Sequence, residues 1–101
     1  MKLTEKCRED YIKYISEKYK LFTGEDFFIM TSIVAVENTL IIEFFDSVEI
    51  YIGVLICIDE TFDSYTLQND VRTECSQFQE NRINAINAAI EKANEIYNND
   101  K

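Results

Sequence analysis

Strict two-residue alternation along residues 48–58 is the feature that most constrains the fold of this chain. Six β-branched residues fall on one face of the segment: Val48, Ile50, Ile52, Val54, Ile56 and Ile58. Side chains of a β-strand point alternately to its two faces, and β-branched residues are enriched in strands. The segment is therefore predicted to be a strand.

Two further strands are predicted before it, from Phe27 to Val36 and from Thr39 to Phe45, because both segments are rich in β-branched and aromatic residues. Glu37-Asn38 and Asp46-Ser47 are expected to form the tight turns, since asparagine tolerates the positive φ of such turns. Short connections of this kind predict an antiparallel three-stranded meander. Residues 61–67 fit either a short fourth strand or an irregular loop.

Amphipathic helices are predicted at both ends of the chain. Apolar residues recur at helical spacing over residues 3–22, and Gly24 follows where a helix commonly stops. A second helical stripe covers residues 71–97, with Asn69 or Asp70 as its cap and a bend near residues 79–82. The 101 residues are sufficient for one core. The prediction is a single α+β domain over residues 1–101, with the order α-β-β-β-(β)-α.

The second face of the predicted sheet is not cleanly polar. Its apolar residues are Phe28, Met30, Val34, Ile41, Phe45, Leu55 and Cys57. An antiparallel sheet with one solvated side alternates more strictly. Either the two helices cover opposite faces, or both lie on one face and the other meets a second protein, and the second arrangement is favoured.

The charge is distributed unevenly. The net charge is -9, and residues 21–71 contain ten Asp and Glu but no Lys or Arg. The acidic excess is therefore expected on the sheet and its loops, where it would create a field of one sign. Such a field repels nucleic acid and anionic membranes, because binding to either needs basic groups. It attracts a basic protein surface, or it serves only solubility.

Several chemistries are disfavoured by the residues that the chain lacks. There is no histidine and no phosphate-binding loop, and the only glycines are Gly24 and Gly53. The three cysteines, without a Cys-x-x-Cys pair, are expected to be reduced thiols packed as small hydrophobic groups. Asp59, Glu60 and Asp63 lack the pattern of a calcium loop. We expect no catalysis, no cofactor and no metal.

The favoured function is binding of a basic protein, such as a nucleic-acid-binding enzyme, by an acidic and aromatic surface. The candidate partner-binding residues are Glu43, Asp46, Glu49, Tyr51, Asp59, Glu60, Asp63 and Tyr65. In size and charge alone, the chain is similar to small acidic phage inhibitors of restriction or CRISPR nucleases. A homo-oligomer joined through the apolar second face of the sheet is the alternative. The chain shows no secretion signal and no apolar run long enough to cross a membrane, so the cytoplasm is the expected compartment.

The last predicted helix is rich in asparagine: Asn81, Asn84, Asn87, Asn94, Asn98 and Asn99. Asparagine is a mediocre helix former. Either the series reflects compositional drift, or it supplies an uncharged hydrogen-bonding face for a partner.

Overall fold

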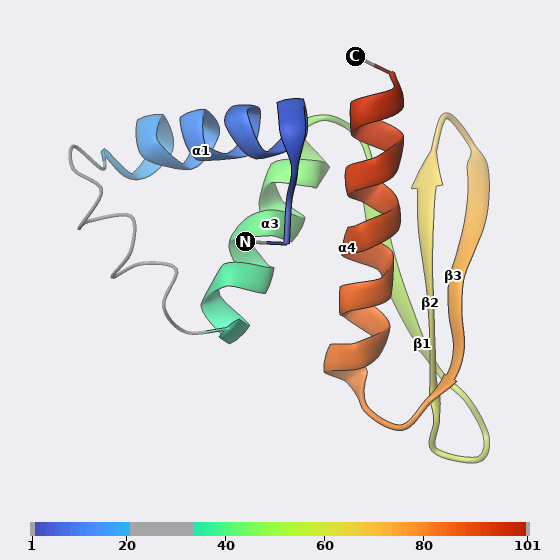
Figure 1. Ribbon diagram of the computed structural model, residues 1–101. Helices are drawn as coiled ribbons and strands as arrows, with labels where there is room; N and C mark the ends of the chain where they lie inside the picture. Colours follow the sequence, from blue (N-terminus) through green and yellow to red (C-terminus); the bar gives the residue numbers. More distant parts are fainter. Residues whose placement is uncertain (1, 21–33, 101) are drawn as a thin grey trace.

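The structure is a computed structural model that describes residues 2–20 and 34–100 (Figure 1). In chain order its elements are α1 (Glu5–Tyr19), α3 (Val34–Ser47), β1 (Tyr51–Ile56), β2 (Phe62–Gln68), β3 (Val71–Gln79) and α4 (Arg82–Asn99). The predicted α+β class is confirmed, as is a three-stranded antiparallel meander flanked by an N-terminal and a C-terminal helix. Helix α3 is an additional element. Strand β1 lies within the predicted strand 48–58, β2 is formed by the segment that fitted either a fourth strand or a loop, and β3 is formed by residues that were predicted to be helical.

The segment predicted as the strand Thr39 to Phe45 is instead part of helix α3. Leu40, Ile41, Phe44 and Phe45 are all buried, and their spacing of one and four residues places them on one face of a helix. Burial of that stripe outweighs the β-forming composition of the segment, so the predicted turn at Glu37-Asn38 is also wrong. The predicted strand from Phe27 lies largely outside the described residues, as does the predicted helix stop at Gly24.

The segment predicted as one helix over residues 71–97 divides into strand β3 and helix α4. Asn69 and Asp70 have φ values of 52° and 64° and connect the paired residues Gln68 and Val71. Two successive positive φ angles form the type I′ turn of a two-residue hairpin. These residues therefore join β2 to β3 and do not cap a helix. Of the two readings of residues 61–67, the strand is confirmed as β2.

The start of α4 is capped by Asn81, whose side-chain oxygen accepts a hydrogen bond of 2.8 Å from the backbone N–H of Asn84. Asparagine is among the strongest N-cap residues because its oxygen satisfies an otherwise unpaired helix N–H. The helix thus begins where the predicted bend was placed.

The two halves of the sheet differ in regularity. Strand β2 lies between β1 and β3, and it pairs with β1 in an uninterrupted register from Tyr51 opposite Leu67 to Ile56 opposite Phe62. The β2–β3 register shifts twice around Ser64, as occurs at β-bulges. β1 and β3 are the two edges of the sheet.

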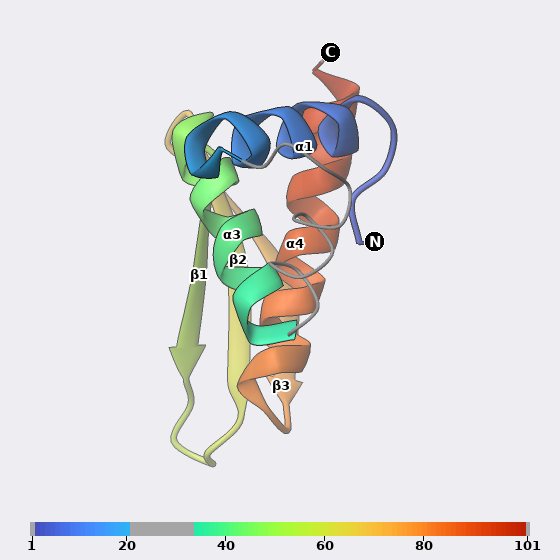
Figure 2. The same cartoon turned by 90° about the vertical axis from the view of Figure 1, so that its left-hand side faces the viewer.

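All described helices lie on the same side of the sheet (Figures 1 and 2). Helix α4 runs along one face of the sheet, and α1 and α3 pack against it. Tyr11 of α1 meets Phe44 of α3 edge to face, with ring centroids 5.8 Å apart. The core of the described residues therefore lies on one side of the sheet, where the favoured arrangement placed both predicted helices.

Among the described residues, no helix is both long enough and apolar enough to cross a membrane.

Two asparagines of α4 complete the N-terminus of α1. The side chain of Thr4 makes no capping hydrogen bond to its own helix. Instead, Asn94 Oδ1 accepts the Thr4 N–H at 2.9 Å and Asn98 Oδ1 accepts the Cys7 N–H at 2.8 Å. Asn98 also donates to the Thr4 carbonyl at 3.0 Å. Since the first N–H groups of a helix have no partner within it, these side chains join two helices distant in sequence.

We expect Asn98→Ala to lower the free energy of unfolding by about 0.5–2 kcal/mol, the range measured for loss of an N-cap. The measurement is urea unfolding followed by circular dichroism. Asn99→Ala is the matched control, because the neighbouring Asn99 is exposed. Equal stability of the two variants would contradict capping of α1 by α4.

Candidate interaction surface

The face of the sheet turned away from the helices has no cover among the described residues. Residues directly opposite each other in a sheet share a face, and the register therefore assigns the members of this surface. We call it the open face: Tyr51, Gly53, Leu55, Asp63, Tyr65, Leu67, Arg72 and Glu74. Tyr51 and Leu55 are 46% and 44% exposed. An exposed group of large apolar side chains is typical of an interaction site.

Tyr65 lies at the centre of the open face, held between Gly53 and Arg72. A Cβ atom on Gly53 would come within 2.1 Å of the Tyr65 ring, so only glycine permits this ring position. The Arg72 guanidinium carbon lies 4.1 Å from the ring centroid, a cation–π contact. Arg72 Nε also lies 2.7 Å from a carboxylate oxygen of Glu74.

Arg72 was missed as a surface residue because its segment was predicted to be helical. The Asn69-Asp70 pair was the available signal, since such a pair between two extended runs is typical of a hairpin. Recognition of that turn would have placed Arg72 in an antiparallel strand beside β2.

A double-mutant cycle measures the Tyr65–Arg72 contact. With Tyr65→Leu and Arg72→Gln, we expect a coupling free energy of about 0.5–1 kcal/mol in urea unfolding, as for exposed cation–π pairs. In a Gly53→Ala background the coupling should vanish, because the new methyl group displaces the ring. Unchanged coupling in that background would contradict the described packing.

The acids were expected on the sheet and its loops, and the structure places five of the eight described ones there, while the other three lie in helix α3. Within residues 34–71, their positions are Glu37, Glu43 and Asp46 in α3, Glu49, Asp59, Glu60 and Asp70 in turns, and Asp63 alone in a strand. The Asp63 carboxylate accepts the Phe78 N–H at 3.0 Å. Asp63 therefore has a structural role beside its place on the open face.

Carboxylates stand at both ends of β1. Glu49 precedes the strand and is exposed, and Asp59 and Glu60 follow it at the tip of the β1–β2 hairpin. Asp59 accepts hydrogen bonds from the hydroxyl and the N–H of Thr61, at 2.6 and 3.2 Å. These bonds lower the pKa of Asp59 and keep it charged. Six residues of strand separate the two ends by roughly 20 Å.

A hollow of about 230 Å³ lies at the Glu49 end, lined by Glu49, Tyr51, Leu67, Asn69 and Asp70. It combines two carboxylates with an aromatic and an aliphatic side chain. A lysine or arginine side chain is suited to such a hollow, because its stem packs on apolar atoms while its head meets the charges. At the Asp59 end, Ile56 and Ile58 are largely exposed.

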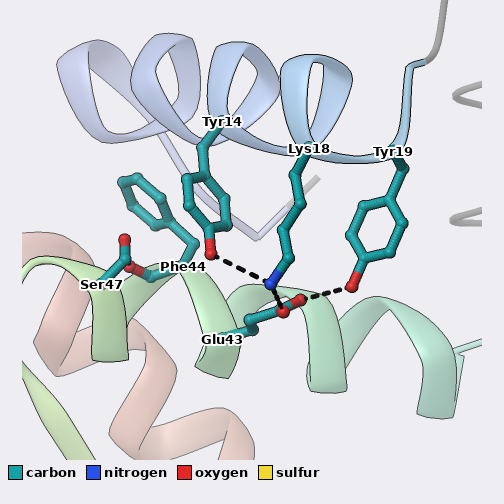
Figure 3. A network of polar contacts seen from close by, with 6 residues as sticks. All are labelled: Tyr14, Lys18, Tyr19, Glu43, Phe44 and Ser47. Carbon is teal, nitrogen blue, oxygen red and sulfur yellow. Dashed lines mark hydrogen bonds and ion pairs between the residues drawn. The ribbon is translucent and has the colours of Figure 1, made fainter.

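Glu43 is not brought together with the other predicted residues. Its carboxylate forms an ion pair with Lys18 of α1 and accepts a hydrogen bond of 2.8 Å from the Tyr19 hydroxyl (Figure 3). The hydrogen bond from Lys18 lowers the pKa of Glu43, and the same bond raises the pKa of Lys18. Glu43 thus ties α1 to α3 within the helical layer.

Asp46 lies one turn beyond Glu43 and near Glu49, whose N–H donates to the Asp46 carbonyl at 3.1 Å. Partial burial, followed by the nearby Glu43 charge, raises the pKa of Asp46. Of the eight predicted residues, Tyr51, Asp63 and Tyr65 share the open face. Glu49, Asp59 and Glu60 lie at the ends of this face. Asp46 lies next to Glu49 in the last turn of α3, and Glu43 lies within the helical layer.

The Glu43 ion pair gives a pH dependence of stability. A carboxyl group whose pKa is lowered by folding stabilises the folded state above its unfolded pKa, and this contribution disappears as the pH falls through the folded pKa. We therefore expect wild type to exceed Glu43→Gln in free energy of unfolding at neutral pH, with the difference shrinking in acid. Lys18→Met should raise the pKa of Glu43, measured by NMR titration, towards its ordinary value.

The cysteines do not form a reactive centre. Burial, and then the charge of Asp10, raises the pKa of the Cys7 thiol to about 12. Burial is also the largest cause of the raised pKa of Cys57 and of Cys75. A thiolate is the nucleophilic form of cysteine, and here it is disfavoured. Within residues 2–20 and 34–100, no group of three or more potential metal-ligating side chains is present.

No family model matches the sequence, and no curated protein or solved structure shows significant similarity to the chain.

Proposed function

We propose that this chain is a non-catalytic binding protein that uses the open face to bind a basic protein. The observation that carries the proposal is the placement of every described helix on one side of the sheet. The other side presents Tyr51, Leu55, Tyr65 and Leu67, and tyrosine is enriched among the residues that dominate binding energy.

Charge supports a basic partner over a neutral one. Glu49 and Asp70 line the hollow beside Tyr51, and Asp59 and Glu60 stand at the other end of β1. The only cation on the open face, Arg72, is already paired with Glu74. Complementary charge accelerates association and excludes wrong partners more than it adds affinity. Added salt screens such charges, so binding should weaken as the salt concentration is raised.

The most concrete version is an inhibitor from a phage or other mobile element that occupies a nucleic-acid-binding enzyme, such as a defence nuclease. Small size, a net charge of -9 and aromatic groups beside carboxylates support this version. Carboxylates and rings can occupy a site built for phosphates and stacked bases. The compartment expected for such a protein is the cytoplasm, and it needs neither metal nor cofactor.

The second candidate is a homo-oligomer joined through the open face, and the exposure of Tyr51 and Leu55 favours it. Light scattering separates the two candidates. A dimer whose stability does not fall with added salt, together with no captured partner, would support the oligomer. A monomer at low salt would support the binding of a different protein.

The test of the proposal is a pull-down from a lysate of the native host at low salt, with salt elution and mass spectrometry. Glu49→Lys/Glu60→Lys should capture the basic partner at least about tenfold less than wild type, a loss of about 1.4 kcal/mol. The matched control is Glu9→Lys/Glu17→Lys, which makes the same change of net charge on the exposed surface of α1. Equal losses from both variants would show that only net charge matters, and no loss from either would overturn the proposal.

A further inference from the structure

The backbone of β1 has hydrogen-bonding groups directed away from the sheet. The Cys57 N–H donates to the Thr61 carbonyl at 2.8 Å, so Cys57 faces β2. Residues of an antiparallel strand alternate between those that bond to the neighbour and those that point away. In the unbroken β1–β2 register, the N–H and C=O groups of Ile52, Val54 and Ile56 therefore point outwards.

The two edges of the sheet are protected to different degrees. β3 carries the charged residues Arg72 and Glu74, and its register shifts twice. Natural proteins use such charges and bulges to prevent pairing at an edge. β1 has the sequence Tyr-Ile-Gly-Val-Leu-Ile, with no charge, no proline and no bulge. Among the described residues, no element lies beyond β1 in the plane of the sheet (Figure 2).

The carboxylates decide which strand fits this edge. In an antiparallel pair of two β1 strands centred on Val54, Glu49 of each copy would stand opposite Asp59 of the other. Like charges opposite each other destabilise a sheet. A strand with cationic ends and an apolar centre would meet carboxylates at both ends and apolar side chains between them. Charge complementarity therefore favours a basic partner over a second copy.

We infer that the basic partner adds an extended segment to the β1 edge as a fourth strand, with lysine or arginine near Glu49 and near Asp59 and Glu60. The inference rests on the proposed function and specifies how the partner is held. Backbone hydrogen bonds to Ile52, Val54 and Ile56 supply affinity, and the side chains and end charges supply specificity, as in other cases of strand addition.

The probe is a synthetic peptide with two lysines at each end and five alternating valine and threonine residues between them. Amide hydrogen exchange is followed by NMR on the full chain. In the free protein the amides of Ile52, Val54 and Ile56 should exchange faster than those of Gly53 and Leu55. At saturating peptide the three outward amides should slow by about tenfold or more, since hydrogen-bonded amides exchange only on opening.

Two changes remove the outward hydrogen bonds without altering charge. Val54→Pro deletes one outward N–H, and proline is tolerated on edge strands. A second peptide carries N-methyl groups on its valine and threonine residues. Each change should weaken binding about tenfold. Circular dichroism checks that the Val54→Pro variant is folded.

The outcomes separate this inference from the proposed function. If methylated and unmethylated peptides bind equally, or if Val54→Pro binds as wild type does, strand addition is overturned. The pull-down with charge-reversed variants would still decide the proposed function. If the peptide does not bind and a concentration-dependent dimer is lost in Val54→Pro, the edge accepts a second copy, and the inference of a cationic strand is wrong.

Discussion

The packing of α4 between the sheet and the other helices determines how the rest of the molecule is arranged. Small side chains are buried on both sides of the contact, with Ala85 and Ala89 on α4 and Ser64 and Thr66 on β2. Small residues allow a helix and a sheet to approach closely. Further along α4, Ala93 and Tyr97 join the apolar cluster that α1 and α3 complete. Helix α4 thus packs against both the sheet and the helices α1 and α3. The core of the described residues covers only one face of the sheet.

Polar contacts from α4 hold the start of α1 and the residues before it in place. Asn94 and Asn98 satisfy the start of α1, and Asn87 accepts a hydrogen bond of 2.9 Å from Lys2. Asparagine is a poor choice for helix stability alone. In this chain it is explained by bonds that hold residues more than eighty positions apart. These bonds give Asn87, Asn94 and Asn98 a structural role that neither interpretation of the sequence included.

The sequence was sufficient to predict the α+β class, α1 and β1, because these segments each show a single clear periodicity, helical in α1 and alternating in β1. It was insufficient for α3 and β3. Ile41 and Phe45 suit either element, and only the packing against α1 and α4 decides between them. Val71, Cys75 and Phe78 have helical spacing by coincidence, in an edge strand whose polar residues show no alternation. Tertiary contacts outweigh local preference in such segments.

The sequence was sufficient to predict the tyrosines of the candidate surface, but not the positions of its acids. Tyr51 and Tyr65 were expected as anchors and do share the open face, since alternation along β1 and β2 was enough to orient them. The acids could not be placed in the same way, because their positions depend on which residues turn. Glu43 was expected on a strand, and once α3 is helical its carboxylate faces Lys18.

The turns determine where the acidic residues lie around the open face. Glu49 and Glu60 have φ values of 62° and 65°, a region that glycine adopts without penalty and that costs most other residues about 1–2 kcal/mol. Asp70 has a φ value of 64°, at a smaller cost, because aspartate tolerates this region in hairpin turns. Lys20 and Phe78 also have positive φ values, so such backbone conformations are not confined to carboxylates. All three carboxylates lie at the ends of β1 or of its neighbour β2. The geometry of the turns, and not the alternation of the strands, therefore sets the positions of the charges beside the open face.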